Sequence, residues 1–311
     1  MMSLPWTRLR GIPLIFDTRA LYVDERIEAG AWRAEDRFYR FAKGVERQLM
    51  RHSTVITVLT HAMQRFLREE YEHRDEIKAP IRVIPTCTDL ELFRPDGPAH
   101  AATAAALGGA RTLLYQGSLS GRYRPDLMAR FYLHWRRAKP GPSRLLVVSR
   151  QEPTAIAKTL REAGDGAEAE LVHRSADRDD IASLIRCATA GIFFYQPALS
   201  TYGTAPTKLG EMLACGLPVA GNAVGDVARV LAEGAGVLVA DESDEAFAAA
   251  ARALAAMEVD GIAEKARAVA KKWFSLEEGI AAYAKIYDAV LSGRVRDLTD
   301  SSWPEPLTSS L

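Results

Sequence analysis

The segment TYGTAPTKLGEMLACGLPVAG, residues 201–221, holds the residues best suited to chemistry. Pro206 fits the first turn of a helix, where its missing N–H is not needed, and Thr204 fits the N-cap. Free N–H groups at a helix start attract phosphate, and a cation in the first turn, Lys208, opposes the helix dipole unless an anion lies between them. Glu211 follows one turn later on nearly the same face, where a carboxylate can accept hydrogen bonds from a ribose diol. The alternative is an exposed Lys208–Glu211 pair of little energetic weight.

A second candidate loop, YQGSLSGRYRPDL, covers residues 115–127. Gly117 permits close backbone approach, and Ser118 with neighbouring N–H groups can hold a phosphate. Arg122 and Arg124 can add charge-assisted contacts. An ordinary strand–turn–helix with solvated arginines explains the same pattern. The loop matches neither GxxxxGK[ST] nor GxGxxG.

Short apolar runs separated by helical patterns must position these loops. Most of the runs are continuously apolar, which is typical of strands covered on both faces. The expected strands cover residues 13–17, 54–59, 81–84, 111–117, 143–149, 169–173, 190–195, 217–221 and 235–239. Strand–helix alternation of this kind predicts a doubly wound α/β fold.

Several segments resemble the retaining, nucleotide-sugar-dependent glycosyltransferases of the GT-B fold. TVITVLTHAMQRFL (54–67) followed by IRVIPTCTDLELFRP (81–95) is similar to the central signature of that family. The 206–221 segment resembles its donor-site helix, and residues 14–26 resemble a stretch of its bacterial surface-polysaccharide members. The resemblance spans residues 12–290. It implies two Rossmann-like domains with parallel sheets, of which the N-terminal one is incomplete.

The resemblance also implies roles for matched residues. Glu211 matches the glutamate that holds the donor ribose, and Gly117 and Ser118 match the loop that meets the diphosphate. Arg122 and Lys208 are the candidates for the two cations that clamp the diphosphate as it leaves, so they are the expected catalytic residues. The family needs no metal where basic residues do this work. No cofactor is therefore expected beyond the nucleotide-sugar, which is a substrate.

Other residues are expected at the edges of this site. Four more are donor-side candidates: Arg150, His173, Pro206 and Thr207. Three are acceptor-side candidates, each with a local structural contact as the alternative: Asp17, Arg19 and His61. Gly203 stands eight positions before Glu211, where the family often has a second glutamate. The usual contact to the donor sugar is therefore expected to be absent or replaced.

The Pro-, Gly- and Ala-rich residues 95–110 predict a domain boundary. The expected organisation is a partial acceptor-side domain (1–95), a donor domain (96–275), a helix that crosses back (276–292) and a poorly ordered tail (293–311). Only three strands are expected before the boundary, and the resemblance implies that about the first third of a full-length enzyme is missing. A partner chain that supplies the missing half is one expected partner.

The composition excludes several classes of protein. The 311 residues contain 40 Lys+Arg and 40 Asp+Glu, so no basic face for nucleic acid is expected. No apolar run approaches the ~20 residues that span a bilayer. Three cysteines at no metal-ligand spacing argue against a disulfide framework and for a reducing cytoplasm. The charged, aromatic residues 33–51 predict a solvated amphipathic helix, or alternatively a helix that binds a partner or lies on the inner membrane face.

The resemblance implies an enzyme that moves a sugar from a nucleotide-sugar to a saccharide or lipid-linked acceptor with retention, in surface polysaccharide or glycolipid assembly. A second hypothesis is a non-catalytic nucleotide-binding subunit or remnant that needs a partner chain. Gly203 and the missing first third favour the second hypothesis. Gly117, Ser118, Lys208 and Glu211 favour the enzyme.

Overall fold

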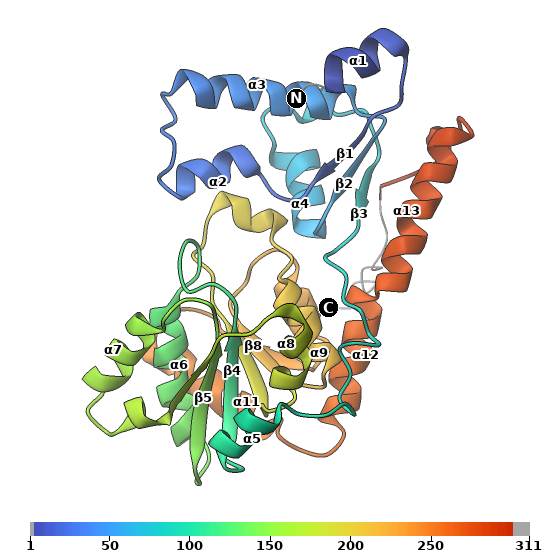
Figure 1. Ribbon diagram of the computed structural model, residues 1–311. Helices are drawn as coiled ribbons and strands as arrows, with labels where there is room; N and C mark the ends of the chain where they lie inside the picture. Colours follow the sequence, from blue (N-terminus) through green and yellow to red (C-terminus); the bar gives the residue numbers. More distant parts are fainter. Residues whose placement is uncertain (1–2, 301–311) are drawn as a thin grey trace.

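Two α/β domains lie one above the other in the computed structural model, which describes residues 3–300 (Figure 1). Within those residues the strands form two sheets, and every named strand pair is parallel. The first sheet has the order β1-β2-β3: β1 (Ile15–Thr18), β2 (Val55–Val58) and β3 (Ile81–Val83). The predicted α/β class with parallel sheets is confirmed.

The second sheet has the order β6-β5-β4-β7-β8-β9. Its strands are β4 (Arg111–Gln116), β5 (Ser143–Val148), β6 (Leu171–Arg174), β7 (Ala190–Phe193), β8 (Val219–Gly221) and β9 (Gly236–Leu238). Every residue of β7 is buried, and in β4 and β5 only Arg111 and Arg144 are half-buried, as the continuous apolar runs predict. The order turns back between β4 and β7, and in open α/β sheets ligands bind at such a switch point.

Helices cover the sheets and supply most of the core. Those of the first domain are α1 (Ser3–Arg10), α2 (Tyr22–Glu28), α3 (Arg37–His52), α4 (His61–Arg65), the π-helical η1 (Phe66–Glu70) and the 3₁₀ turn η2 (Arg74–Glu76). Those that follow are α5 (Ala101–Leu107), α6 (Pro125–Arg137), α7 (Thr154–Glu162), η3 (Ala167–Glu170), α8 (Arg178–Ile185), η4 (Leu199–Gly203), α9 (Thr207–Ala214), α10 (Val227–Leu231), α11 (Asp244–Ala256) and α12 (Ile262–Phe274). None of the helices within residues 3–300 is long and apolar enough to cross a membrane.

The last helix, α13 (Leu276–Leu291), runs along the side of the first sheet (Figure 1). Its Ile286 packs with Val55 and Ile84 of the first domain. The segment after it, which includes η5 (Val295–Asp297), continues along the same domain.

The expectation of a poorly ordered tail is wrong for residues 295–300. Val295 and Leu298 pack against the cluster around Ile286. The carboxylate of Asp300 forms an ion pair with Arg68 at 2.7 Å. The segment is polar in composition, but its two apolar side chains join a cluster that includes Val55 and Ile84 of the first domain, and its Asp300 pairs with a residue 232 positions earlier in the chain. Residues 301–311 of the predicted tail lie outside the described residues.

The two domains are joined by carboxylates that accept hydrogen bonds from the other domain's backbone. Asp226 accepts from the backbone N–H groups of His61 and Ala62, at the start of α4, at 2.6 and 3.1 Å. Glu28 of α2 accepts from the backbone N–H of Ser200, in η4, at 2.9 Å. Each contact satisfies helix N–H groups that would otherwise lack partners. The arrangement fixes α2 and α4 against the second domain.

Candidate active site between the domains

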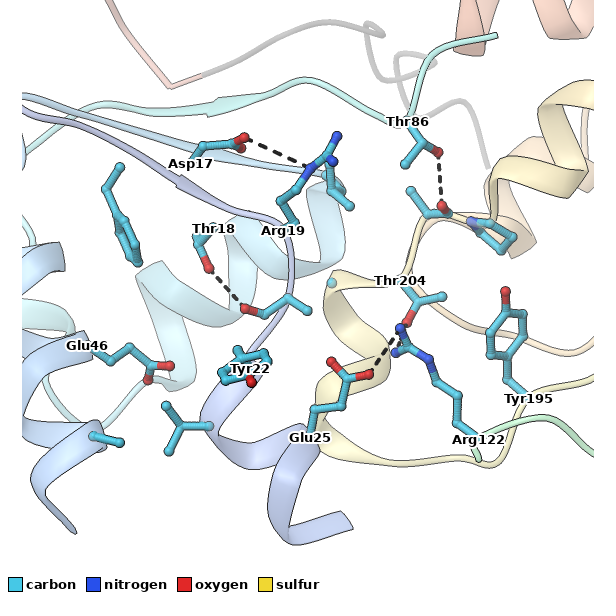
Figure 2. Close-up of a pocket in the computed structure, with 18 of the residues that line it drawn as sticks. Asp17, Thr18, Arg19, Tyr22, Glu25, Glu46, Thr86, Arg122, Tyr195 and Thr204 are labelled. Carbon is cyan, nitrogen blue, oxygen red and sulfur yellow. Dashed lines mark hydrogen bonds and ion pairs between the residues drawn. The ribbon is translucent and has the colours of Figure 1, made fainter. Parts of the chain in front are cut away.

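A cavity of about 760 Å³ lies between the two domains. Figure 2 shows Arg122, Tyr195 and Thr204 on its second-domain side and Glu46 on its first-domain side. The second-domain wall also includes the start of α9 with Lys208, next to the carboxyl end of β4. Ligands of open α/β sheets bind at such an edge.

Lys208 is a buried cation that faces this cavity. Its side chain is held among tyrosine rings, with Nζ 4.5 Å from the centroid of the Tyr115 ring and 4.3 Å from that of Tyr123. The residue is 7% exposed. Burial lowers the pKa of Lys208 to about 7, and the charge of Glu211 offsets this only in part. Since ring faces attract a cation but do not neutralise it, Lys208 retains the capacity to bind an anion.

Gly117 lies directly against Lys208. It has a φ of 122°, which favours glycine, and a Cβ at this position would be 2.7 Å from Lys208 Nζ. The hydroxyl of Tyr115 donates to the carbonyl oxygen of Ser118, which fixes the loop after β4. The loop after β4 and the start of α9 are therefore in contact.

Glu211 is positioned by Gln116, the last residue of β4. Gln116 Nε2 donates to Glu211 Oε2. Burial raises the pKa of Glu211 to about 7, although Gln116, Arg178 and Lys208 each lower it in part. Within residues 3–300, Gln116 Oε1 is a buried oxygen that accepts no hydrogen bond. Glu211 does not itself line the interdomain cavity.

Arg122 is the second cation on this wall. Its Nη1 donates to Thr204 Oγ1 at 3.2 Å, and its Nη2 lies 3.4 Å from Glu25 Oε1 of α2. Both residues of the Arg122–Glu25 pair are partly exposed and line the cavity. The N-cap of α9 is Pro206, not Thr204, and Thr207 is the first helical residue and exposed. The expected cap is wrong because Thr204 Oγ1 accepts from Arg122 instead.

A smaller hollow of about 390 Å³ lies on another side of the Gly117 loop. Gly117, Ser118 and Arg150 line it. Gln151 Oε1 accepts from Ser118 Oγ and from the N–H of Leu119, at 2.9 and 2.6 Å.

The other two donor-side candidates of this region make local contacts. The side chain of Arg150 is 77% exposed and pairs with Asp177 at 3.0 Å. His173 Nε2 lies 2.9 Å from the carbonyl oxygen of Ser149. The structure therefore separates Arg150 and His173 from Arg122 and Lys208, which line the interdomain cavity.

The acceptor-side candidates lie in different environments. Asp17 and Arg19 line the cavity, with Arg19 Nε 3.9 Å from Asp17 Oδ2. Asp17 Oδ1 accepts from Thr57 Oγ1 at 2.9 Å. His61 is buried at the start of α4, with Nδ1 3.4 Å from Gln64 Oε1, and does not line the cavity. The local contacts proposed as alternatives for Asp17 and His61 are thus present.

Gly203 leaves no room for a side chain. A Cβ at this position would be 2.8 Å from Met63 Cε and 3.2 Å from Ala20 Cα. The first domain therefore occupies the space that a glutamate at position 203 would need. Glu25 supplies a carboxylate to the cavity instead, and it faces Arg122.

The sequence analysis did not single out five residues of this region as site residues: Tyr115, Tyr123, Gln151, Glu25 and Glu46. Tyr115 and Tyr123 flank the loop it had singled out, so their positions at a strand end were a usable signal. Glu25 and Glu46 lie on first-domain helices, and no local pattern distinguishes them from solvated charges. Within residues 3–300, no group of three or more His, Cys, Asp or Glu side chains is placed to hold a metal ion.

A family model described as Glycosyl transferases group 1 matches residues 110–257. Sucrose-phosphate synthase from Thermosynechococcus elongatus is similar in structure, with TM-score 0.62, 19% identity, and coverage of 93% of this chain and 71% of that one. Anabaena Alr3699/HepE, solved with UDP and glucose, has TM-score 0.65 and 14% identity, and the match covers 93% of this chain and 74% of that one. WaaG, a glycosyltransferase involved in lipopolysaccharide biosynthesis, has TM-score 0.61 and 19% identity, and the match covers 89% of this chain and 74% of WaaG.

No curated protein matches this sequence. The structural likenesses show the fold, and the family model covers the domain that contains Gly117, Arg122, Lys208 and Glu211. Residues 110–257 are therefore similar to a group 1 glycosyltransferase domain, within a chain that has the two-domain GT-B fold.

Proposed function

We propose that this protein transfers a sugar from a nucleotide-sugar donor to an acceptor hydroxyl, with retention of anomeric configuration. The observation that supports this most is the buried Lys208 ammonium, which lies against Gly117 and faces the interdomain cavity. A buried cation without a carboxylate partner is unfavourable unless an anion binds to it. A diphosphate on the donor is such an anion.

The donor diphosphate lies between Lys208 and Arg122, with the N–H groups of the Gly117–Ser118 loop and of the α9 start as further donors. Pro206 and Thr207 shape that helix start. The bond between the anomeric carbon and the diphosphate oxygen breaks while the acceptor oxygen bonds to the same face of that carbon. The acceptor proton passes to the departing phosphate. Lys208 and Arg122 lower the barrier because they stabilise the charge that develops on the leaving group.

The nucleoside occupies the region around Gln116, Glu211 and the hollow beside Ser118. Glu211 and the free Gln116 Oε1 accept hydrogen bonds from ribose hydroxyls. Arg150 and His173 lie nearer to the base. No metal is required, since the two cations neutralise the diphosphate. The donor domain is assigned to residues 96–275.

The acceptor enters from the first domain, where Asp17 and Arg19 line the cavity. We assign the reaction to surface polysaccharide or glycolipid assembly at the cytoplasmic face of the inner membrane. The similarity to WaaG supports this pathway. A partner chain is consistent with the similarity to the GtfA/B complex.

Calorimetric titration of the full chain with UDP, GDP and ADP, each paired with its monophosphate, tests the donor site. One diphosphate should bind at least about tenfold more tightly than its monophosphate, because charged hydrogen bonds contribute about 1.5–3 kcal/mol. The matching nucleotide-sugar then serves for product analysis by proton NMR, where the retained anomer should appear first. Equal affinity for monophosphates and diphosphates would contradict the proposal.

A further inference from the structure

We infer that the acceptor carries an apolar chain, and that this chain binds in the first-domain part of the interdomain cavity. This inference rests on the proposed function and names the class of its second substrate. We call this part of the cavity the apolar lobe, formed by six side chains: Phe16, Val23, Trp32, Phe38, Val45 and Leu49.

The apolar lobe is continuous with the charged wall of the same cavity. Phe16 comes from β1, Val23 from α2, and Val45 from α3, while Arg122 and Lys208 line the opposite side. A molecule in the apolar lobe can therefore present a hydroxyl to a donor held by the two cations. Figure 2 shows this relation, with Glu46 of α3 at one end of the cavity and Arg122 at the other.

Three charged groups of α2 and α3 beside the apolar lobe are bonded to one another. Lys43 Nζ lies 2.5 Å from Glu46 Oε1 and 2.9 Å from Asp24 Oδ2. Burial raises the pKa of Glu46, so its environment disfavours the charged form. A saccharide needs several hydrogen-bond partners, which the six apolar side chains cannot supply. An alkyl or isoprenoid chain needs none.

Aromatic side chains surround the outer end of the apolar lobe. The Trp32 ring packs edge-to-face with Phe38, at 4.9 Å between centroids, and with Tyr22, at 6.4 Å. Tyr22 and Phe38 are 53% and 56% exposed. Sites for small apolar ligands are lined mainly by hydrophobic and aromatic side chains, and Tyr22, Trp32 and Phe38 all line this cavity.

Two phenylalanines of α3 provide a matched pair for the test. Phe38 lines the cavity, whereas Phe41 does not, and their exposures are 56% and 59%. Because both side chains are exposed, truncation of either should leave the fold intact. Only Phe38→Ala removes part of the apolar lobe.

The probes are octyl β-D-glucopyranoside, below its critical micelle concentration, and methyl β-D-glucopyranoside. Each is titrated into the full chain with saturating UDP, and binding is followed by calorimetry. Burial of one methylene favours binding by roughly three- to fourfold. The octyl glucoside should therefore bind more than tenfold tighter than the methyl glucoside. Phe38→Ala should weaken octyl glucoside binding by about fivefold, and Phe41→Ala should leave it unchanged.

Equal affinity for the two glucosides would overturn the inference, as would equal effects of the two alanine variants. Titration of UDP alone separates this result from the proposed function. If UDP binds but the length of the alkyl chain has no effect on affinity, the inference about the apolar lobe is refuted and the proposed donor site is retained. If the length of the alkyl chain affects affinity but UDP does not bind, an apolar chain binds in the apolar lobe and the proposed sugar transfer is refuted.

Discussion

Two lysines on opposite sides of the cavity show how differently the two domains treat a buried cation. Lys208 of the second domain contacts tyrosine faces, and burial lowers its pKa to about 7. Burial also lowers the pKa of Lys43 in the first domain, but its pairs with Glu46 and Asp24 outweigh this and the pKa is raised. Lys43 is neutralised inside the protein, whereas we propose that Lys208 binds an external anion.

The comparison separates a structural role from a binding role. The Lys43 cluster joins α2 to α3 and leaves the apolar lobe without an unpaired cation. Lys208 instead faces the cavity together with Arg122. Stability should therefore depend on Lys43 and ligand affinity on Lys208, and the following predictions test this division.

Lys43→Met should produce the largest effect on folding. Removal of the ammonium leaves the carboxylates of Asp24 and Glu46 without their cation, and we expect a loss of roughly 2–3 kcal/mol in the free energy of unfolding. Urea denaturation followed by circular dichroism measures it. UDP affinity of the folded variant should match that of the wild type, and a parallel loss of affinity would remove the distinction between the two lysines.

Lys208→Met should have the opposite pattern. We expect UDP affinity to fall by about 2–3 kcal/mol, because the diphosphate loses a charged hydrogen bond. The melting temperature without ligand should stay the same or rise, since an unpaired buried charge has been replaced by an apolar side chain. Calorimetry and thermal unfolding measure the two quantities. A destabilised variant with unchanged UDP affinity would assign Lys208 to the fold.

Glu211→Ala should weaken the binding of UDP and of uridine alike, by about 1–2 kcal/mol, because the ribose hydroxyls lose their acceptor. Lys208→Met is the matched contrast, since it should spare uridine. Calorimetric titration with both ligands distinguishes the two. If Glu211→Ala weakened UDP but not uridine, the carboxylate would act on the diphosphate and not on the ribose.

Glu25→Gln should have the smallest effect and the opposite sign. The Glu25 carboxylate lies 3.4 Å from Arg122 and competes with the diphosphate for it, so the variant should bind UDP about threefold more tightly. Glu28→Gln is the control, because Glu28 lies on the same helix but binds Ser200 and does not line the cavity. Weaker UDP binding by Glu25→Gln would mean that this carboxylate contacts the donor.

Much of the second domain could be predicted from local sequence. Continuous apolar runs indicated the parallel strands, and the residues around Pro206 indicated that Lys208 lies in the first turn of a helix. The strand inference succeeds because strand burial follows from the run of neighbours in sequence, whereas the exact cap of that helix depends on the contact of Thr204 with Arg122. The prediction that residues 295–300 are poorly ordered was wrong. Asp300 pairs with Arg68, and a local sequence pattern cannot indicate a contact between residues so far apart in the chain.

The first-domain side of the cavity could not be predicted in the same way. Lys43, Glu46 and Asp24 read as charges on amphipathic helices, and only the packing of α2 on α3 makes them a cluster. The same holds for Glu25, which meets Arg122 only because the domains are apposed. Gly203 was noted as a departure, but its cause, contact with Ala20 and Met63, is again a tertiary feature.

The protonation of Lys208 on UDP binding tests the central claim most directly. With a pKa of about 7, Lys208 is mostly neutral at pH 8, and a bound diphosphate requires the charged form. Calorimetry at pH 8 in two buffers of different ionisation enthalpy should report uptake of ~0.9 proton per UDP, and affinity should fall as pH rises above 7. Lys208→Met should abolish the uptake. No proton uptake by the wild type, or the same uptake by the variant, would contradict the account.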